Sequence, residues 1–196
     1  CVAVVARQNY PHVLTLVVDN GSAAGSLGPL EALAVPFELI RNPQNLGFSG
    51  GVNAGIAWAM SAGADYVWLL NNDATPATDT LDSLVAALQA DPRNGLASPV
   101  LRNAGADSEV QFCGGFWDGC WAEGTADLAI YRAWAAQHPE RIWLSGTALL
   151  IRRALIEAIG RFDDRFFAYW EDVDYSVRAI AAGYRNVIVT HAEVYH

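Results

Sequence analysis

Two amides and a carboxylate follow directly on an apolar segment in the first half of the chain. Residues 66–70 (YVWLL) have the pattern of a strand buried on both faces of a sheet, and Asn71, Asn72 and Asp73 come next. Pro76 keeps the strand from simply continuing. Ligands of open α/β sheets bind outside the carboxyl ends of the strands, where a carboxylate can hold a divalent metal and, through it, a phosphate. The alternative is that these three residues only form a turn.

A second acidic cluster, Glu171, Asp172 and Asp174, opens a predicted helix in the sequence WEDVDYSVRAIAAG. The helix dipole favours carboxylates in a first turn, and this is the ordinary reason to find them there. Three of them in four positions exceed what one dipole requires. Glu171 and Asp174 share a helix face, whereas Asp172 projects elsewhere. One carboxylate can therefore pair with Arg178 inside the fold while another faces a cleft as a general base.

Two further segments carry residue types that bind nucleotides. Asp19 ends an apolar segment and can accept hydrogen bonds from a base or a ribose, although the sequence DNGS is also an ordinary turn or helix cap. The segment NLGFSGGVNAG brings glycines to the mouth of a helix, where a backbone can approach an anion closely. Close helix packing is the alternative. The spacing is neither GxGxxG nor a P-loop, which needs a lysine that this chain lacks.

Histidines and tryptophans add weaker signals. His191 and His196 flank the last apolar segment. A lone histidine is more often structural than a ligand, so His196 matters only if the fold brings it near Asp73. The irregular segment 102–140 carries aromatic rings that could stack on sugar rings, with packing as the alternative for each. These rings are Trp117, Trp121 and Trp134.

A sheet must bring these residues together, and the first half of the chain alternates strand and helix patterns, typical of a parallel-type sheet with helices on its faces. Apolar segments predict strands, and apolar residues at helical spacing predict helices. The expected strands are 2–5, 12–19, 37–41, 66–70, 96–101, 110–112, 141–152 (broken by Ser-Gly-Thr), 187–190 and 194–196. The expected helices are 50–63, 78–90, 128–137, 154–159 and one from the WEDVD cluster to Gly183.

The composition limits the classes of protein and the partners that are expected. The 196 residues suit a single domain, and 53% hydrophobic with 17% charged residues exclude a disordered chain. The apolar segments are too short to span a membrane, and no secretory signal is visible. Net charge is −9, and all 12 basic residues are scattered arginines, so nucleic acid is not an expected partner. The cysteines (Cys1, Cys113 and Cys120) lack metal-site spacing and are expected to be reduced thiols.

Six segments, in this order, resemble the family-2 glycosyltransferases of the GT-A fold, in wording closest to the rhamnosyltransferase-like branch. They are VVDNGS, NPQNLGFSGGVNAGI, DYVWLLNNDATP, LSGTALLIRR, IGRFDDRFFAYWEDVDYSVRAIAAGYR and the final VYH. The resemblance covers well over half of the chain. It implies an α/β domain of GT-A type over 1–196, with a mostly parallel nucleotide-binding sheet flanked by helices. Residues 1–101 would form the nucleotide-sugar half, and residues 102–196 the acceptor and catalytic half, with a smaller mixed region.

The resemblance also implies roles for the residues. Asp172 matches the catalytic base, and Glu171 is its close neighbour. Asp73 and His196 match residues that bind a metal, Mg²⁺ or Mn²⁺, on the diphosphate. Asn71 replaces the first aspartate of the family's Asp-x-Asp motif and can still reach a ribose or the metal. The other residues expected around the donor nucleotide lie in the matching segments: Asp19, Ser22, Asn42, Gly50, Gly51, Asn53 and Asn72. The segment 145–147 begins the acceptor side.

The expected enzyme is an inverting, metal-dependent glycosyltransferase of cell-envelope polysaccharide biosynthesis. It moves a hexosyl or deoxyhexosyl group from a UDP- or dTDP-sugar to a glycan or lipid-linked saccharide. The expected location is the cytoplasm, with peripheral association at the inner face of a membrane left open. A sugar nucleotidyltransferase is one alternative, but it needs a glycine-rich basic segment after the first strand, and residues 2–5 have none. The other, a non-catalytic nucleotide- or sugar-binding module, would be expected to have lost Asp73 or Asp172.

Two departures from the family pattern concern the ends of the chain. Relatives place a strand and a full helix before VVDNGS, whereas residues 7–11 (RQNYP) read like the end of that helix and follow the first apolar segment almost at once. Residues are therefore expected to be missing after Val5. The chain also stops at His196, where relatives continue, so the acceptor site is expected to be incomplete.

Overall fold

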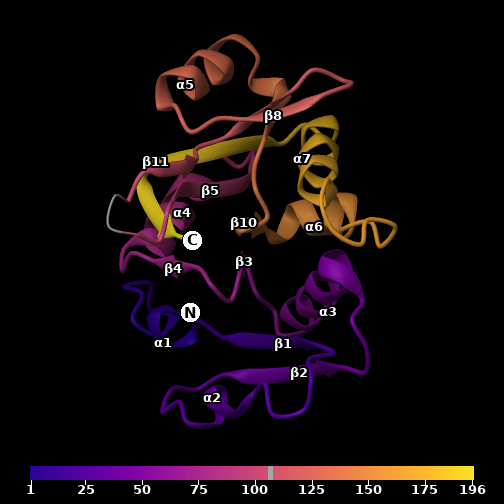
Figure 1. The fold of residues 1–196 in the computed structure, drawn as a ribbon. Helices are drawn as coiled ribbons and strands as arrows, with labels where there is room; N and C mark the ends of the chain where they lie inside the picture. Colours follow the sequence, from indigo (N-terminus) through magenta and orange to yellow (C-terminus); the bar gives the residue numbers. More distant parts are fainter. Residues whose placement is uncertain (106–107) are drawn as a thin grey trace.

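The computed structural model describes residues 1–105 and 108–196, apart from the side chain of residue 31. It is an α/β fold in which helices flank a central sheet (Figure 1). The helices are α1 (Val2–Val5), α2 (Gly28–Glu31), α3 (Gly47–Ser61), α4 (Thr80–Ala90), α5 (Leu128–Gln137), the 3-10 helix η1 (Pro139–Arg141), α6 (Arg153–Ile159) and α7 (Glu171–Ala181). Within the described ranges, no helix is both long and apolar enough to cross a membrane.

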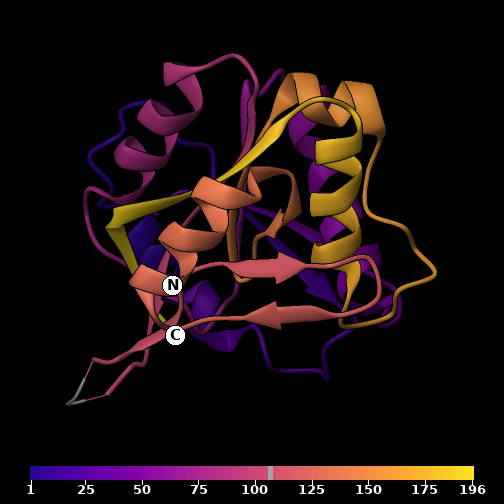
Figure 2. The same ribbon diagram turned by 90° about the horizontal axis from the view of Figure 1, so that it is seen from above.

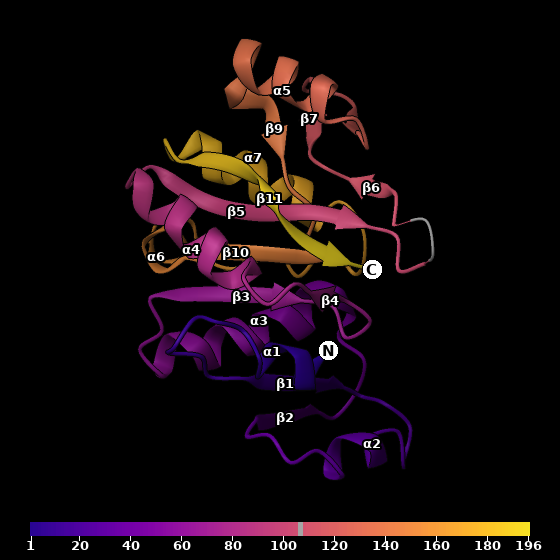
Figure 3. The same ribbon diagram turned by 90° about the vertical axis from the view of Figure 1, so that its left-hand side faces the viewer.

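The strands of the described residues form three sheets. They are β1 (Leu16–Asn20), β2 (Glu38–Asn42), β3 (Tyr66–Leu70), β4 (Thr75–Pro76), β5 (Asn94–Arg102), β6 (Val110–Phe112), β7 (Gly115–Trp117), β8 (Ala122–Gly124), β9 (Ile142–Trp143), β10 (Ala148–Arg152) and β11 (Arg185–Tyr195). The central sheet has the order β3-β10-β5-β11-β4, with β6 added beside β5. A parallel pair β1-β2 and a small antiparallel sheet β8-β7-β9 complete the molecule (Figure 3).

The direction of the central strands decides where polar residues meet. β10 lies between β3 and β5 and runs opposite to both, while β11 runs parallel to β5. Consequently β3, β5 and β11 share one direction, and their carboxyl ends lie at the same edge as the amino end of β10. The expected mostly parallel sheet is therefore corrected to a mixed one, because a strand from the second half of the chain is inserted between two strands of the first half.

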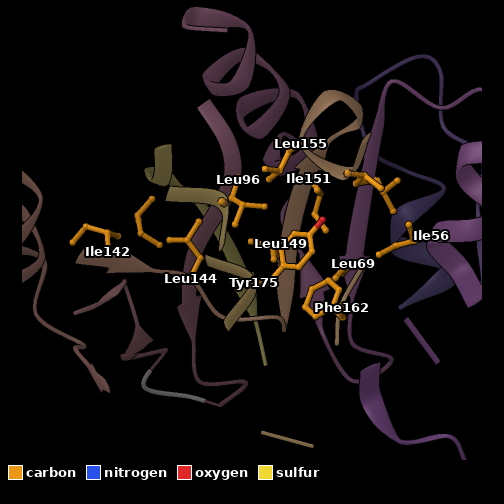
Figure 4. Packing of buried hydrophobic residues seen from close by; sticks show 14 of the residues in the cluster. Ile56, Leu69, Leu96, Ile142, Leu144, Leu149, Ile151, Leu155, Phe162 and Tyr175 are labelled. Carbon is orange, nitrogen blue, oxygen red and sulfur yellow. The ribbon is translucent and has the colours of Figure 1, made fainter. Parts of the chain in front are cut away.

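The core lies on both faces of this sheet. Successive residues of β10 point to opposite sides, as strand geometry requires. Leu150 packs with the helix α4 residues Leu84 and Leu88 on one face. On the other face, Leu149 and Ile151 belong to the larger cluster, shown in Figure 4. That cluster also contains residues of α3, α6 and α7: Ile56, Leu155 and Tyr175.

Most predicted elements are confirmed, three of them (β3, β6 and α5) with the expected bounds. The strand predicted at residues 2–5 is wrong, because this segment is helix α1. Four apolar residues are too few to distinguish the two periodicities. The strands predicted at 187–190 and 194–196 are parts of one strand, β11, whose pairing with β5 shifts register between Val189 and Glu193.

Candidate active site

The Asn71–Asp73 segment forms a tight turn at the carboxyl end of β3. The Ala74 N–H donates to the Asn71 carbonyl at 3.1 Å, which places Asn72 and Asp73 at the centre of the turn. The Asn71 N–H donates to the Thr147 carbonyl at 2.9 Å. Ala74 is fully buried, whereas 71% of the Asp73 side chain is exposed. The segment thus forms a turn and also exposes the Asp73 carboxylate.

His196 reaches this turn from the end of β11. Its Nε2 lies 3.4 Å from Asp73 Oδ1, and its Nδ1 lies 3.2 Å from Gln111 Oε1. Nδ1 thus faces an amide oxygen and Nε2 faces a carboxylate oxygen, so each ring nitrogen has a hydrogen-bond acceptor in front of it. The backbone of His196 is fixed at both ends, since its N–H donates to Arg102 and its carbonyl accepts from Ala104.

The Asp73–His196 pair fits part of a metal site. A carboxylate oxygen and an imidazole nitrogen lie next to each other, and both are atom types that bind Mn²⁺ or a similar divalent ion. Within the described ranges, no cluster of three or more His, Cys, Asp or Glu side chains gathers. Mg²⁺ in nucleotide sites is usually bound through one or two carboxylates plus substrate phosphates. Two protein donors therefore suit an ion that a diphosphate brings with it.

Asp172 is held by backbone donors at the start of α7. Its Oδ2 accepts from the Gly146 N–H at 3.1 Å, and its Oδ1 accepts from the Val173 N–H at 2.9 Å. Burial raises the pKa of this carboxyl, and the two backbone hydrogen bonds oppose the rise only in part. A Cβ on Gly146 would lie 3.2 Å from Phe48 Cζ and 3.7 Å from the Cβ of Asp172, so this glycine permits the close approach.

One short segment joins the two carboxylates. Gly146 donates to Asp172, and the next residue, Thr147, accepts from Asn71 at the base of the Asp73 turn. The Ser145 hydroxyl donates to the Thr147 hydroxyl oxygen at 3.1 Å within the same segment. The turn that carries Asp73 and the carboxylate of Asp172 therefore bond neighbouring residues of the loop before β10, although the two aspartates are about a hundred positions apart in the sequence.

The other two carboxylates of the α7 cluster have different environments. Asp174 pairs with Arg178 at 2.8 Å, which confirms that one member of the cluster is used inside the fold. Glu171 is 6% exposed, and its Oε2 lacks a hydrogen-bond partner among the described residues. Burial raises the pKa of Glu171, and the neighbouring charge of Asp172 adds to the rise. A buried carboxyl of this kind favours its neutral form.

The expected nucleotide residue Asp19 lies at the end of β1. Its Oδ1 accepts from the Ser22 N–H at 2.9 Å, so the DNGS segment is the turn that its composition favours. Hydrogen bonds from Ser22, followed by the charge of Arg41, lower the pKa of Asp19 and keep it ionised. These three residues line a pocket of about 190 Å³ together with residues 23–25, 27 and 28.

Asn20 joins the loops on this side, and the sequence offered no signal that singled it out. Its Oδ1 accepts from Asn42 Nδ2 at 3.0 Å and from the Leu46 N–H at 3.2 Å. Its Nδ2 donates to Asn45 Oδ1 at 3.1 Å and to the Gly47 carbonyl at 2.8 Å. One amide thus holds the loop after β2 and the start of α3 against the end of β1.

Several residues expected near the nucleotide have partners within the protein. Asn42 donates to Asn20, and a Cβ on Gly51 would meet the same side chain at 3.1 Å. A Cβ on Gly50 would meet Leu46 Cβ at 2.5 Å. Both glycines lie inside α3 and permit close packing, the alternative recognised in the sequence. Their contact with a nucleotide stays a prediction.

Asn53 is buried and bonds a distant loop. Its Nδ2 donates to the Phe162 carbonyl at 2.9 Å and to Asp164 Oδ1 at 2.6 Å. Its Oδ1 accepts from the Phe162 N–H at 3.0 Å. The amide therefore holds the loop before α7 against α3, and its contact with a nucleotide stays a prediction.

The chain also matches known proteins. A family model described as "Glycosyl transferase family 2" matches residues 1–160, most of the chain. The chain belongs to glycosyl transferase family 2. The α/β domain with helices flanking a central sheet is the GT-A fold expected from the sequence.

Curated relatives support the rhamnosyltransferase-like branch. The N-acetylglucosaminyl-diphospho-decaprenol L-rhamnosyltransferase of Mycobacterium tuberculosis is 32% identical over 211 residues, covering 94% of this chain and 66% of that protein. The galactofuranosyltransferase GlfT1 of Mycolicibacterium smegmatis is 26% identical over 189 residues, covering 92% of this chain and 60% of that protein. The chain therefore spans somewhat less than two thirds of the length of these relatives.

Solved structures agree on the fold. The mannosyltransferase PcManGT of Pyrobaculum calidifontis, in complex with GDP-Man and Mn²⁺, superposes with a TM-score of 0.72 at 20% identity. That comparison covers 99% of this chain and 51% of the other. GalNAc-T7 with UDP, GalNAc and Mn²⁺ gives 0.69 at 15% identity, covering 93% of this chain and 37% of the other.

Proposed function

We propose that this family-2 domain transfers a sugar, with inversion, from a UDP- or dTDP-sugar to a hydroxyl of a lipid-linked saccharide. The observation that carries the proposal is the loop before β10, which bonds the Asp73 turn with Thr147 and the Asp172 carboxylate with Gly146. A one-step inversion needs a base on the face of the sugar opposite the leaving diphosphate. The turn that carries Asp73 and the carboxylate of Asp172 come from separate elements and bond adjacent residues of this loop, which supports such an arrangement.

Asp172 would accept the proton of the acceptor hydroxyl as it attacks. Its two backbone hydrogen bonds fix the carboxylate in one orientation. A fixed orientation favours proton transfer, because the base must lie within hydrogen-bond distance of the proton that it accepts. Burial raises its pKa and thereby strengthens it as a base, while it still has to be ionised at working pH. Glu171, buried beside it, also has a raised pKa, because of its burial and the charge of Asp172.

Asp73 and His196 would hold a divalent ion, Mg²⁺ or Mn²⁺, on the diphosphate. Such an ion neutralises charge that develops on the departing diphosphate. Asp19, ionised and turned toward the pocket that it lines with Ser22 and Arg41, would hold the nucleotide through its base or ribose. Asn71, at the start of the turn, would contact the ribose or support the metal site.

The relatives support a lipid-linked acceptor. The mycobacterial rhamnosyltransferase is named for an N-acetylglucosaminyl-diphospho-decaprenol acceptor, and its likeness to this chain extends over 94% of the chain. A lipid-linked acceptor would bring the enzyme to the cytoplasmic face of a membrane and into cell-envelope polysaccharide synthesis.

Nucleotide-dependent thermal stabilisation tests the donor site. UDP or dTDP should raise the melting temperature only with Mn²⁺ or Mg²⁺, because Asp73 acts through the ion. Asp73→Ala should abolish this dependence, whereas Asp65→Ala, an exposed aspartate at the opposite end of β3, should keep it. Equal metal-dependent stabilisation in wild type and Asp73→Ala would reject the assignment of Asp73.

A further inference from the structure

Two tryptophan rings meet beside the start of α7. Trp117 ends β7, and Trp170 immediately precedes α7, with ring centroids 6.3 Å apart at an interplanar angle of 80°. Figure 2 shows the β7–β8 hairpin extending to the beginning of this helix. Trp170 is 45% exposed, and its neighbour Tyr169 is 83% exposed. The edge-to-face contact holds two large rings in fixed positions at the surface.

Packing does not account for the position of Trp170. Neither ring of the pair belongs to the hydrophobic clusters of the described core. Tyr169 and Trp170 have φ values of 70° and 73°, in the left-handed region that non-glycine residues rarely occupy. Two such residues in succession turn the chain so that the indole of Trp170 meets Trp117. Backbone strain of this kind occurs most often where a binding or catalytic site requires it.

The pair lies close to the catalytic carboxylate. Only Glu171 separates Trp170 from Asp172, so their Cα atoms are at most about 7.6 Å apart from chain geometry. The ring pair and the Asp172 carboxylate, which bonds Gly146, thus belong to the same helix start. In an inverting reaction the base and the acceptor share one side of the donor sugar, and the diphosphate lies on the other. Asp19 and the Asp73–His196 pair mark the diphosphate side, so the ring pair belongs to the acceptor side.

We propose that Trp117 and Trp170 form the stacking surface for the saccharide ring of the acceptor, an inference that rests on the proposed transferase function. Flat aromatic faces suit the C–H face of a sugar. The hydroxyls of Ser145 and Thr147 lie on either side of Gly146, whose N–H donates to Asp172. An anionic membrane surface fits the same region poorly, because the chain has a net charge of −9 and no basic cluster.

Steady-state kinetics with two acceptors tests the proposal. One acceptor is N-acetylglucosaminyl-diphospho-decaprenol in detergent, and the other is a short-chain, water-soluble analogue with the same sugar. Trp117→Ala and Trp170→Ala should each raise KM for both acceptors about tenfold, the scale of one lost aromatic contact. Trp117→Phe and Trp170→Phe keep an aromatic face and should recover most of the loss. Trp121→Ala, an exposed ring outside the pair, is the matched control and should leave KM unchanged.

Two further readouts separate this proposal from the proposed function. Urea unfolding first identifies the variants that are as stable as the wild type. In these variants, the affinity for UDP or dTDP with Mn²⁺ should be unchanged, and so should the rate at which water hydrolyses the donor sugar. If the wild type transfers no sugar, the proposed function fails, whatever the tryptophans do. If it transfers sugar and both alanine variants keep the wild-type KM, the stacking surface is refuted. It is equally refuted if only vesicle binding falls and KM for the soluble acceptor does not change.

Discussion

Replacing Asn20 with alanine tests whether one amide positions the donor-side loops. The substitution removes four hydrogen bonds, to Asn42, Leu46, Asn45 and Gly47, without touching the hydrophobic core. The loop after β2 and the start of α3 would then lose their attachment to the end of β1. Asp19, next in the chain to Asn20, depends on the same arrangement for its place beside the pocket.

The expected cost follows from the number of bonds. A net 0.5–1.5 kcal/mol per hydrogen bond gives roughly 2–6 kcal/mol for four. The side chain is only partly buried, and water can replace some of the lost partners, so a destabilisation of about 2–3 kcal/mol is expected. For a chain of this size that corresponds to a fall in melting temperature of roughly 5–10 °C.

Urea unfolding, followed by circular dichroism, measures the change in the free energy of unfolding. Asn9→Ala, at an exposed asparagine, is the matched control and should change it by no more than about 0.5 kcal/mol. Asn20→Ala should also weaken binding of UDP or dTDP in the folded protein. A destabilisation as small as that of the control, with unchanged nucleotide affinity, would refute the role given to Asn20.

Three other substitutions or conditions give distinct outcomes. Asn53→Ala should lower the free energy of unfolding by about 2–4 kcal/mol, because it removes the hydrogen-bond partner of the Phe162 backbone. The nucleotide affinity of the folded variant should not change. A loss of nucleotide affinity without a loss of stability would contradict this structural role. Wild type should lose stability as pH rises from the unfolded pKa of Glu171 through its raised folded pKa, and Glu171→Gln, which cannot ionise, should lose less. Identical urea midpoints across that range would count against the raised pKa of Glu171. Transfer should fall as pH drops through the raised pKa of Asp172, so an acid limb of kcat/KM at or below the ordinary aspartate pKa of about 3.9 would contradict its burial.

The sequence predicted those elements whose apolar patterns are long or sharply bounded. β3 and α5 have the expected limits, and the placement of Asp73 at a strand end followed from the residues alone. The segment 2–5 was mispredicted, because four apolar residues fit a strand and a helix equally well. The partner of Asp73 could not be found by periodicity, since His196 reaches it through the pairing of β11 with β4.

Sequence patterns could not predict which polar side chains bond several distant loops, nor which residues have unusual backbone conformations. Asn20 looks like any turn asparagine, and its importance arises from loops 22 to 27 positions away. Asn53 was expected near the nucleotide, but its partners Phe162 and Asp164 are more than a hundred positions distant. The left-handed conformation of Trp170 has no signature in composition, and only the fold reveals its contact with Trp117.

The central claim is that Asp172 removes the acceptor proton while a separate group of residues holds the donor. Asp172→Asn keeps the size of the side chain and one oxygen for the Gly146 N–H, but it removes the base. Calorimetry of UDP or dTDP with Mn²⁺, paired with a radiolabelled transfer assay, measures both properties on one preparation. We expect Asp172→Asn to keep wild-type nucleotide affinity and to lose at least a hundredfold in transfer, on the scale of general-base catalysis, roughly 10²–10⁴. Transfer at the wild-type rate by Asp172→Asn would contradict it.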